Sequence, residues 1–170
     1  MKKIVTLILA FATFNSFAQE RIPYEQIALE YYIKSIKKDD IKDLPVFAKT
    51  LNGRWYYNTP CVVEHFSIQI KDTLKNPPIN GYYSKLDLSF HKNLIPVSHH
   101  EHKIVVSPAT QFNDIILVAI IEYNSVKFER RNKKPKGFYI SLDVNGNVIE
   151  WKECQYVYPK IKYPKGSFKK

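Results

Sequence analysis

Apolar residues recur at helical spacing near the start of the chain, and farther along their spacing changes to two. Residues 23–38 carry an apolar stripe at every third or fourth position, which predicts an amphipathic helix that begins near Pro23. Aspartates at positions 39, 40 and 43 follow, and aspartate is a favoured N-cap residue. They predict a second, shorter helix that ends at Asn52-Gly53. Its apolar side carries Leu44, Phe47, Ala48 and Leu51.

Beyond Gly53, short segments with a period of two predict strands. The alternating or apolar segments are residues 54–57, 62–70, 82–91 and 103–107. Residues 115–121 differ from these because they are apolar without interruption. Such a run predicts a central strand that is buried on both faces of a sheet.

Asn145-Gly146 lies between two apolar segments, which is typical of a two-residue hairpin turn. That turn pairs Leu142 with Ile149 and Ile140 with Trp151. Because partners across a hairpin share one face of the sheet, Ile149 and Trp151 are expected in the core.

These elements predict an α+β protein in which an N-terminal helix and a short second helix pack on a curved, mainly antiparallel sheet. The composition agrees, because the 12 Tyr and 10 Phe residues favour a sheet over a helical bundle. The length suits a single domain, which we place at residues 19–158, followed by a basic C-terminal tail at 159–170.

A helix, a short helix and then a sheet built mostly as a meander resemble the NTF2-like members of the cystatin-like α+β superfold. The resemblance rests on the tyrosine-rich first helix, on the break at Lys38-Asp39-Asp40-Ile41, and on the hairpin over residues 138–151 with its Asp-x-Asn-Gly-x-Val-Ile pattern. Such proteins bind small molecules, peptides or partner proteins in a cone between helices and sheet, and only some are enzymes. The resemblance implies a binding cavity and leaves its ligand open.

Residues 1–18 have the three parts of a secretory signal peptide. Lys2-Lys3 precede an apolar run over residues 4–14, and Ser16 and Ala18 are small residues at positions −3 and −1 of a cut after Ala18. The apolar run is shorter than the ~20 residues of a membrane-spanning helix. We therefore expect cleavage, no transmembrane segment in the mature chain, and a periplasmic or secreted protein.

The sequence contains two cysteines, Cys61 and Cys154. In an oxidising compartment an even pair of this kind predicts a disulfide bond. The alternative is two buried free thiols that pack as small apolar side chains.

Positive charge is concentrated near the C-terminus. The net charge is +10, yet residues 19–129 carry 13 basic and 13 acidic side chains, whereas residues 130–170 carry 11 basic and 3 acidic ones. A one-ended field attracts anionic partners, although a solvated face that only aids solubility has the same composition. The candidate binding residues are Arg130, Arg131, Lys133, Lys134, Lys136, Lys160 and Lys162.

An acidic protein or an anionic envelope surface is the partner that suits an exported protein with this charge. Nucleic acid is a less suitable partner, because export separates the protein from it and no nucleic-acid-binding motif is present.

His99-His100-Glu101-His102 is a candidate metal site. On an extended segment His100 and His102 share one face, and two imidazoles in that arrangement can bind Zn²⁺ or Cu²⁺. The candidates for a further ligand are His91, His65 and Glu101. The alternative is an exposed polar loop, and no other cofactor is indicated.

Catalysis has weaker support in the sequence, which contains no Gly-x-Ser-x-Gly motif. In an NTF2-like cone an inward-pointing histidine could act as a general base, and His65 fits that role, with Asp87 or Asp114 as its carboxylate partner. The cavity that it would face is lined by Tyr31, Tyr32 and Trp55. The alternative is a histidine with a purely structural role in the core.

We expect an exported, non-enzymatic binding domain whose basic C-terminal end contacts an acidic partner, as an immunity or inhibitor protein would. One alternative is a small-molecule binder or enzyme that uses an NTF2-like cone. Another is a metal-binding protein that uses residues 99–102. The sequence leaves the partner and the oligomeric state open.

Overall fold

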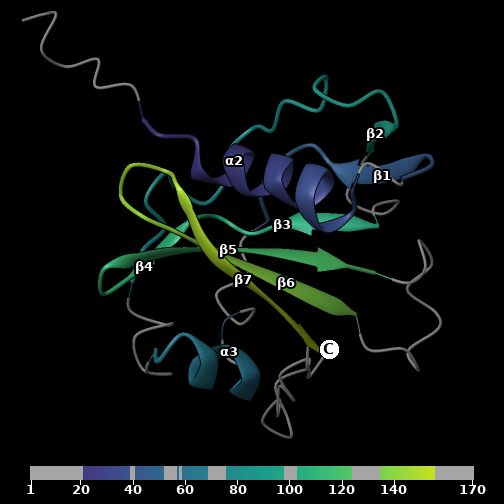
Figure 1. The fold of residues 1–170 in the computed structure, drawn as a ribbon. Coiled ribbons are helices and arrows are strands. Elements are labelled where there is room, and N and C mark those ends of the chain that lie inside the picture. Colours follow the sequence, from purple (N-terminus) through teal and green to yellow (C-terminus); the bar gives the residue numbers. More distant parts are fainter. Residues whose placement is uncertain are drawn as a thin grey trace, which may run out of the picture.

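In the computed structural model, two helical segments lie on opposite faces of one seven-stranded sheet (Figure 1). The structure describes residues 21–38, 41–51, 57, 59–68, 76–97, 103–123 and 135–155. On one face, helix α2 (Tyr24–Tyr31) continues into the π-helical segment η2 (Tyr32–Ile36). On the other face lies the short helix α3 (Pro60–His65). The predicted α+β class is confirmed.

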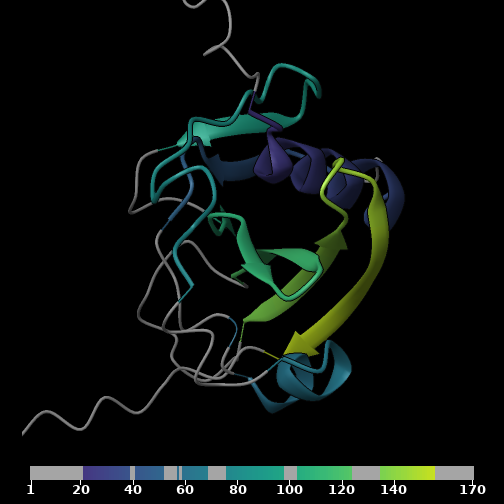
Figure 2. The ribbon, with the colours of Figure 1, turned by 90° about the vertical axis from the view of Figure 1, so that its left-hand side faces the viewer.

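The sheet is mixed and mostly antiparallel, with the strand order β2-β1-β3-β5-β6-β7 and with β4 paired to β5. Strand β1 runs parallel to both β2 and β3, and the remaining pairs are antiparallel. Figure 2 shows β7 curving from the side of α2 toward α3. The strands are β1 (Leu44–Phe47), β2 (Leu94–Val97), β3 (Ile104–Val106), β4 (Thr110–Phe112), β5 (Ile115–Glu122), β6 (Lys136–Leu142) and β7 (Val148–Gln155).

Strand β5 is buried on both faces, as its uninterrupted apolar run predicts. Because successive side chains of a strand point to opposite faces, the run supplies two cores at once. Val118 and Ile120 belong to the core beneath α2, whereas Leu117 and Ile121 belong to the core beside α3.

Helix α2 and η2 bury the stripe that the periodicity predicts. Leu29, Tyr32 and Ile33 are fully buried against the sheet. Full burial of one such aliphatic side chain stabilises the fold by roughly 1.5–3 kcal/mol. The stripe therefore fixes the helix on this face.

The core on the α3 side is built around Tyr57, which is 1 % exposed. Its hydroxyl lies 2.7 Å from the Ser107 hydroxyl and donates or accepts there, and it also lies within hydrogen-bond distance of the carbonyls of Pro108 and Leu117. Burial raises the pKa of Tyr57, so this phenol stays neutral. These bonds satisfy a polar group that would be costly to bury unpaired.

The second helix that was predicted before Asn52-Gly53 is wrong in position, because residues 44–47 form β1. Pro45 lacks the N–H that a helix interior needs. Asp43, just before the strand, has a positive φ of 43°, which is incompatible with a right-handed helix. The second helix of the fold is α3, where residues 62–70 were predicted to be a strand. Pro60 begins it at the first helical position.

Residues 82–91 are not a strand either, although the predicted alternation of their side chains is correct. Leu86 and Leu88 are buried, while Lys85 and Asp87 are exposed. The described ladder contacts of this segment are limited to an isolated bridge between Lys49 and Lys85. Its shape is therefore set mainly by hydrogen bonds outside the sheet ladder.

The hairpin between β6 and β7 is confirmed, but its register is only partly as predicted. Ile140 pairs with Trp151 as expected, whereas Leu142 pairs with Val148 across a bulge and not with Ile149. The cause is a longer loop with a positive φ at Gly146. Ile149 and Trp151 are 55 % and 40 % exposed, so they are not core residues.

Candidate functional site

Both basic segments of the chain are attached to one end of the sheet. In the register of the strands, Glu122 at the end of β5 faces Lys136 at the start of β6, and Lys136 faces Gln155 at the end of β7. Residues 124–134 connect β5 to β6, and the C-terminal tail follows β7. We call this end, defined by Glu122, Lys136 and Gln155, the basic end. The candidates Arg130, Arg131, Lys133, Lys134, Lys160 and Lys162 lie outside the described residues.

Lys136 is the predicted binding residue that the structure describes, and it already has an acidic partner. Its Nζ lies 2.9 Å from Oε1 of Glu153 on the neighbouring strand. That hydrogen bond raises the pKa of Lys136. The positive charge of Lys136 is thus partly balanced by the carboxylate of Glu153.

A second carboxylate at the basic end is that of Glu122 on β5. It accepts hydrogen bonds from the helical segment that covers the core beneath α2. Lys37 Nζ donates to both carboxylate oxygens, at 3.1 and 2.8 Å, and the Tyr32 hydroxyl donates to Oε2 at 3.1 Å. The same ammonium group lies 5.6 Å from the ring centroids of Tyr32 and Phe138. Burial and the charge of Glu122 raise the pKa of Tyr32. We call Tyr32, Lys37 and Glu122 the carboxylate cluster.

The π-helical segment explains why two residues five positions apart reach the same carboxylate. The N–H of Lys37 donates to the carbonyl of Tyr32 at 2.9 Å, a bond that spans five residues instead of four. In an α-helix with 3.6 residues per turn, Tyr32 and Lys37 would point in different directions. The wider turn brings both side chains over Glu122, and such turns are frequent at functional sites.

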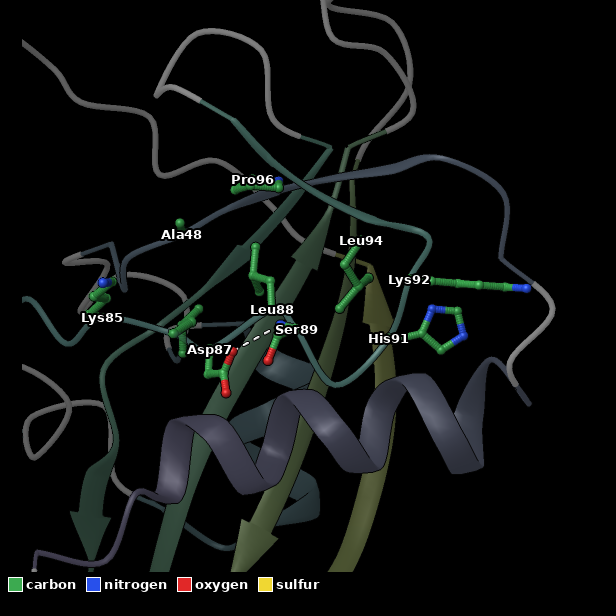
Figure 3. Close-up of a pocket in the computed structure, with 10 residues that line it drawn as sticks. Ala48, Lys85, Asp87, Leu88, Ser89, His91, Lys92, Leu94 and Pro96 are labelled. Atoms are coloured by element: carbon green, nitrogen blue, oxygen red, sulfur yellow. Dashed lines mark hydrogen bonds between the residues drawn. The ribbon is translucent and has the colours of Figure 1, made fainter.

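A groove of about 650 Å³ opens beside the segment between residues 85 and 96. Figure 3 shows Lys85 at one end of it, His91 and Lys92 at the other, and Leu88 and Leu94 between them. The buried leucines give it an apolar floor. Its lining residues are Ala48, Lys85, Leu86, Asp87, Leu88, Ser89, His91, Lys92, Leu94 and Pro96.

The wall of the groove is held in place without regular secondary structure. The side-chain amide of Gln26 on α2 donates to the Asp87 carbonyl at 2.9 Å and accepts from the Asp87 N–H at 3.0 Å. On the opposite side, the N–H of Leu86 donates to the carbonyl of Ala48 at 3.1 Å. Farther along, the Asn93 amide donates to the carbonyl of Ile41 at 2.6 Å. The wall is therefore pre-formed, as ligand sites commonly are.

Positive charge predominates on the rim of the groove. Lys85 and Lys92 are exposed lining residues, and Asp87 is the acidic one. Hydrogen bonds from Ser89 hold the pKa of Asp87 below its usual range, so this carboxylate is ionised at neutral pH. Two lysines still outnumber it.

His65 does not face Tyr31 and Tyr32, because α3 and α2 lie on opposite faces of the sheet. Its Nε2 lies 3.2 Å from Oε2 of Glu150 on β7, and the imidazole is partly exposed. The proposed partners Asp87 and Asp114 are also exposed residues. Trp55 lies outside the described residues. The described side-chain partner of His65 is therefore Glu150 on β7, on the face of the sheet opposite to Tyr31 and Tyr32.

Of the predicted metal ligands, His91 lies at the rim of the groove, where its Nδ1 accepts the N–H of Asn93 at 3.2 Å. His100 and His102 lie outside the described residues. In the part of the chain that the structure describes, no three His, Cys, Asp or Glu side chains come close enough together to hold a metal ion.

The predicted disulfide is present, with the Cα atoms of Cys61 and Cys154 6.0 Å apart. It ties α3 to the edge strand β7. A bond of this kind fits export to an oxidising compartment. No helix within the described ranges is long and apolar enough to cross a membrane.

The sequence prediction missed both the groove and the carboxylate cluster. The signal for the groove was present: polar residues alternate with Leu86 and Leu88, and the next residues include His91 and Lys92. No local signal relates Tyr32 to Glu122, which is 90 residues away.

Comparisons with known proteins found no match for the chain among protein-family models, curated protein sequences or solved structures.

Proposed function

We propose that this chain is a non-enzymatic binding domain, exported to the periplasm or secreted, that contacts an acidic protein through its basic end. The observation that carries the proposal is the strand register, in which Glu122 faces Lys136 and Lys136 faces Gln155. This register attaches both basic segments to one end of a rigid sheet. A single acidic surface can then meet both segments.

The described carboxylates at this end support the proposal because they already have lysine partners. Glu122 binds Lys37, and Glu153 binds Lys136. The cationic side chains of residues 130–134 and of the tail therefore outnumber the unpaired carboxylates that the described sheet has at this end. An excess of one sign steers association with a partner of the other sign. An immunity or inhibitor protein is one form that such a domain takes.

The test replaces Arg130, Arg131, Lys133 and Lys134 together with serine. Rim charges act mainly on the association rate and its salt dependence, so we expect an association rate lower by on the order of tenfold and a flatter response to salt. The measurement is affinity capture from the envelope fraction of the cells that make the protein, followed by mass spectrometry and by kinetics on the captured acidic protein.

A matched control replaces four other cationic residues with serine, Arg21, Lys49, Lys85 and Lys152, which are exposed and lie outside the row of Glu122, Lys136 and Gln155. It lowers the net charge equally and should retain the acidic partner. Equal capture by both variants contradicts the proposal. Capture of phosphatidylglycerol vesicles, with no acidic protein retained, contradicts it in favour of an anionic envelope surface.

A further inference from the structure

The groove beside residues 85–96 combines a buried apolar floor with a cationic rim, and this combination selects a class of ligand. Leu86, Leu88 and Leu94 are 3 %, 8 % and 6 % exposed, so the floor belongs to the core beneath α2. A site of about 650 Å³ lies within the range of about 300–1,000 Å³ that small-molecule sites occupy.

The charged residues of the rim select ligands by their charge. Lys85 and Lys92 lie at opposite ends of the groove (Figure 3), and the imidazole of His91 lies beside Lys92. Asp87 cannot neutralise both ends, since it supplies one negative charge against the two positive charges of the lysines. An anionic head group is therefore favoured at either end of the groove, and an apolar body is favoured along the leucines.

The wall is also organised before any ligand arrives. The paired hydrogen bonds between Gln26 and the backbone of Asp87 attach the wall to α2. Lys34 on η2 lies 5.5 Å from the ring centroid of Phe90 and holds the same segment farther along. A pre-formed wall reduces the ordering cost of binding.

We propose that this groove binds the carboxylate form of a linear acyl chain, with the chain along Leu88 and Leu94 and the carboxylate at a lysine of the rim. The site is separate from the basic end and does not depend on it. It assigns a small-molecule ligand to a face of the molecule that the protein-binding proposal leaves unused.

The test uses decanoate as the probe and follows backbone amide shifts of the full mature chain by NMR. We expect saturable shifts that centre on residues 85–96. Octanoate, which is two methylenes shorter, should bind more weakly by on the order of tenfold, because each buried methylene contributes about 0.8 kcal/mol. Decylammonium carries the same chain with a positive head group and should bind at least tenfold more weakly than decanoate.

Two pairs of variants keep the test decisive. Lys85→Glu with Lys92→Glu should lower decanoate affinity at least tenfold, whereas Lys42→Glu with Lys152→Glu makes the same change in net charge at exposed residues outside the groove and should not. Ser89→Trp fills the groove from an exposed position and should abolish the shifts, whereas Ser35→Trp on η2 should leave them unchanged.

Shifts that do not saturate, or that centre elsewhere, overturn the proposal. Equal affinity for decanoate and decylammonium, or binding that survives Ser89→Trp in a folded protein, overturns it as well.

Discussion

At the scale of single residues, the structure contains two lysine–glutamate pairs with the same separation and different surroundings. Lys37 and Glu122 are 2.8 Å apart and 27 % and 24 % exposed, while Lys34 and Glu30 are also 2.8 Å apart and 54 % and 35 % exposed. Each glutamate accepts a further hydrogen bond, Glu122 from the fully buried Tyr32 and Glu30 from the side-chain amide of Gln26. Because solvent screens the exposed pair, only the Glu122 pair should contribute measurably to the free energy of unfolding.

Glu122→Ala should lower the free energy of unfolding by about 1–3 kcal/mol, because it leaves the Tyr32 hydroxyl and the Lys37 ammonium without their shared acceptor. Glu30→Ala is the matched control and should cost less than about 0.5 kcal/mol. Urea unfolding of the two variants measures both values. Equal losses would show that the carboxylate cluster contributes no more than an ordinary surface pair.

At the scale of elements, the β6–β7 loop is fitted against the start of α2. The Tyr24 hydroxyl donates to the Val144 carbonyl at 2.8 Å. Gly146 has a φ of +87°, and a Cβ built on it would lie 2.9 Å from Ile27 and 3.1 Å from Ile22. The loop therefore needs glycine both for its backbone conformation and for its contact with the helix.

Gly146→Ala should destabilise the protein by about 2–3 kcal/mol, from a strained φ and from a forced shift of the isoleucine side chains. Gly81 is the matched control, since it has the same φ of +87° and a Cβ added to it would meet no heavy atom within 4 Å. Gly81→Ala should cost only about 1–2 kcal/mol. Thermal unfolding of both variants gives the comparison, and equal shifts in Tm would rule out the packing contribution.

The elements that sequence predicted well are those whose signal is local. The helix stripe at Leu29 and Ile33, the buried run of β5 and the hairpin at Gly146 depend on neighbouring residues alone. Strand β1, which was predicted to be part of a helix, depends on distant partners: residues 44–47 are a strand because β2 and β3 lie on either side of them. The NTF2-like resemblance stays a prediction.

At the scale of the whole molecule, one covalent bond joins the layer of α3 to the edge of the sheet. Cys61 and Cys154 are separated by 93 residues, and the bond closes most of the described fold into one loop. Val62 and Phe66 pack α3 on the sheet, but the helix has only six residues. The disulfide should therefore contribute a large share of what holds α3 in place.

Replacing Cys61 and Cys154 together with serine should lower the free energy of unfolding by about 2–5 kcal/mol. Amide exchange should increase more in α3 than in α2, because α3 is then no longer attached to β7 by a covalent bond and can open locally. Hydrogen exchange measured by NMR tests both regions in one sample. Unchanged protection of α3 would mean that its apolar contacts suffice.

The place of β1 in the sheet also sets an order of events during synthesis. β1 precedes both of its neighbours in the chain, since Leu44 pairs with Leu94 and Val46 pairs with Ile104. At roughly 5–20 residues per second, the ribosome needs on the order of seconds to make those partners. By contrast, β5, β6 and β7, which are made later, pair with near neighbours in sequence and close short loops quickly. Residues 44–47 therefore stay unpaired while the chain up to β3 is made, and during that interval they are a natural binding segment for a chaperone.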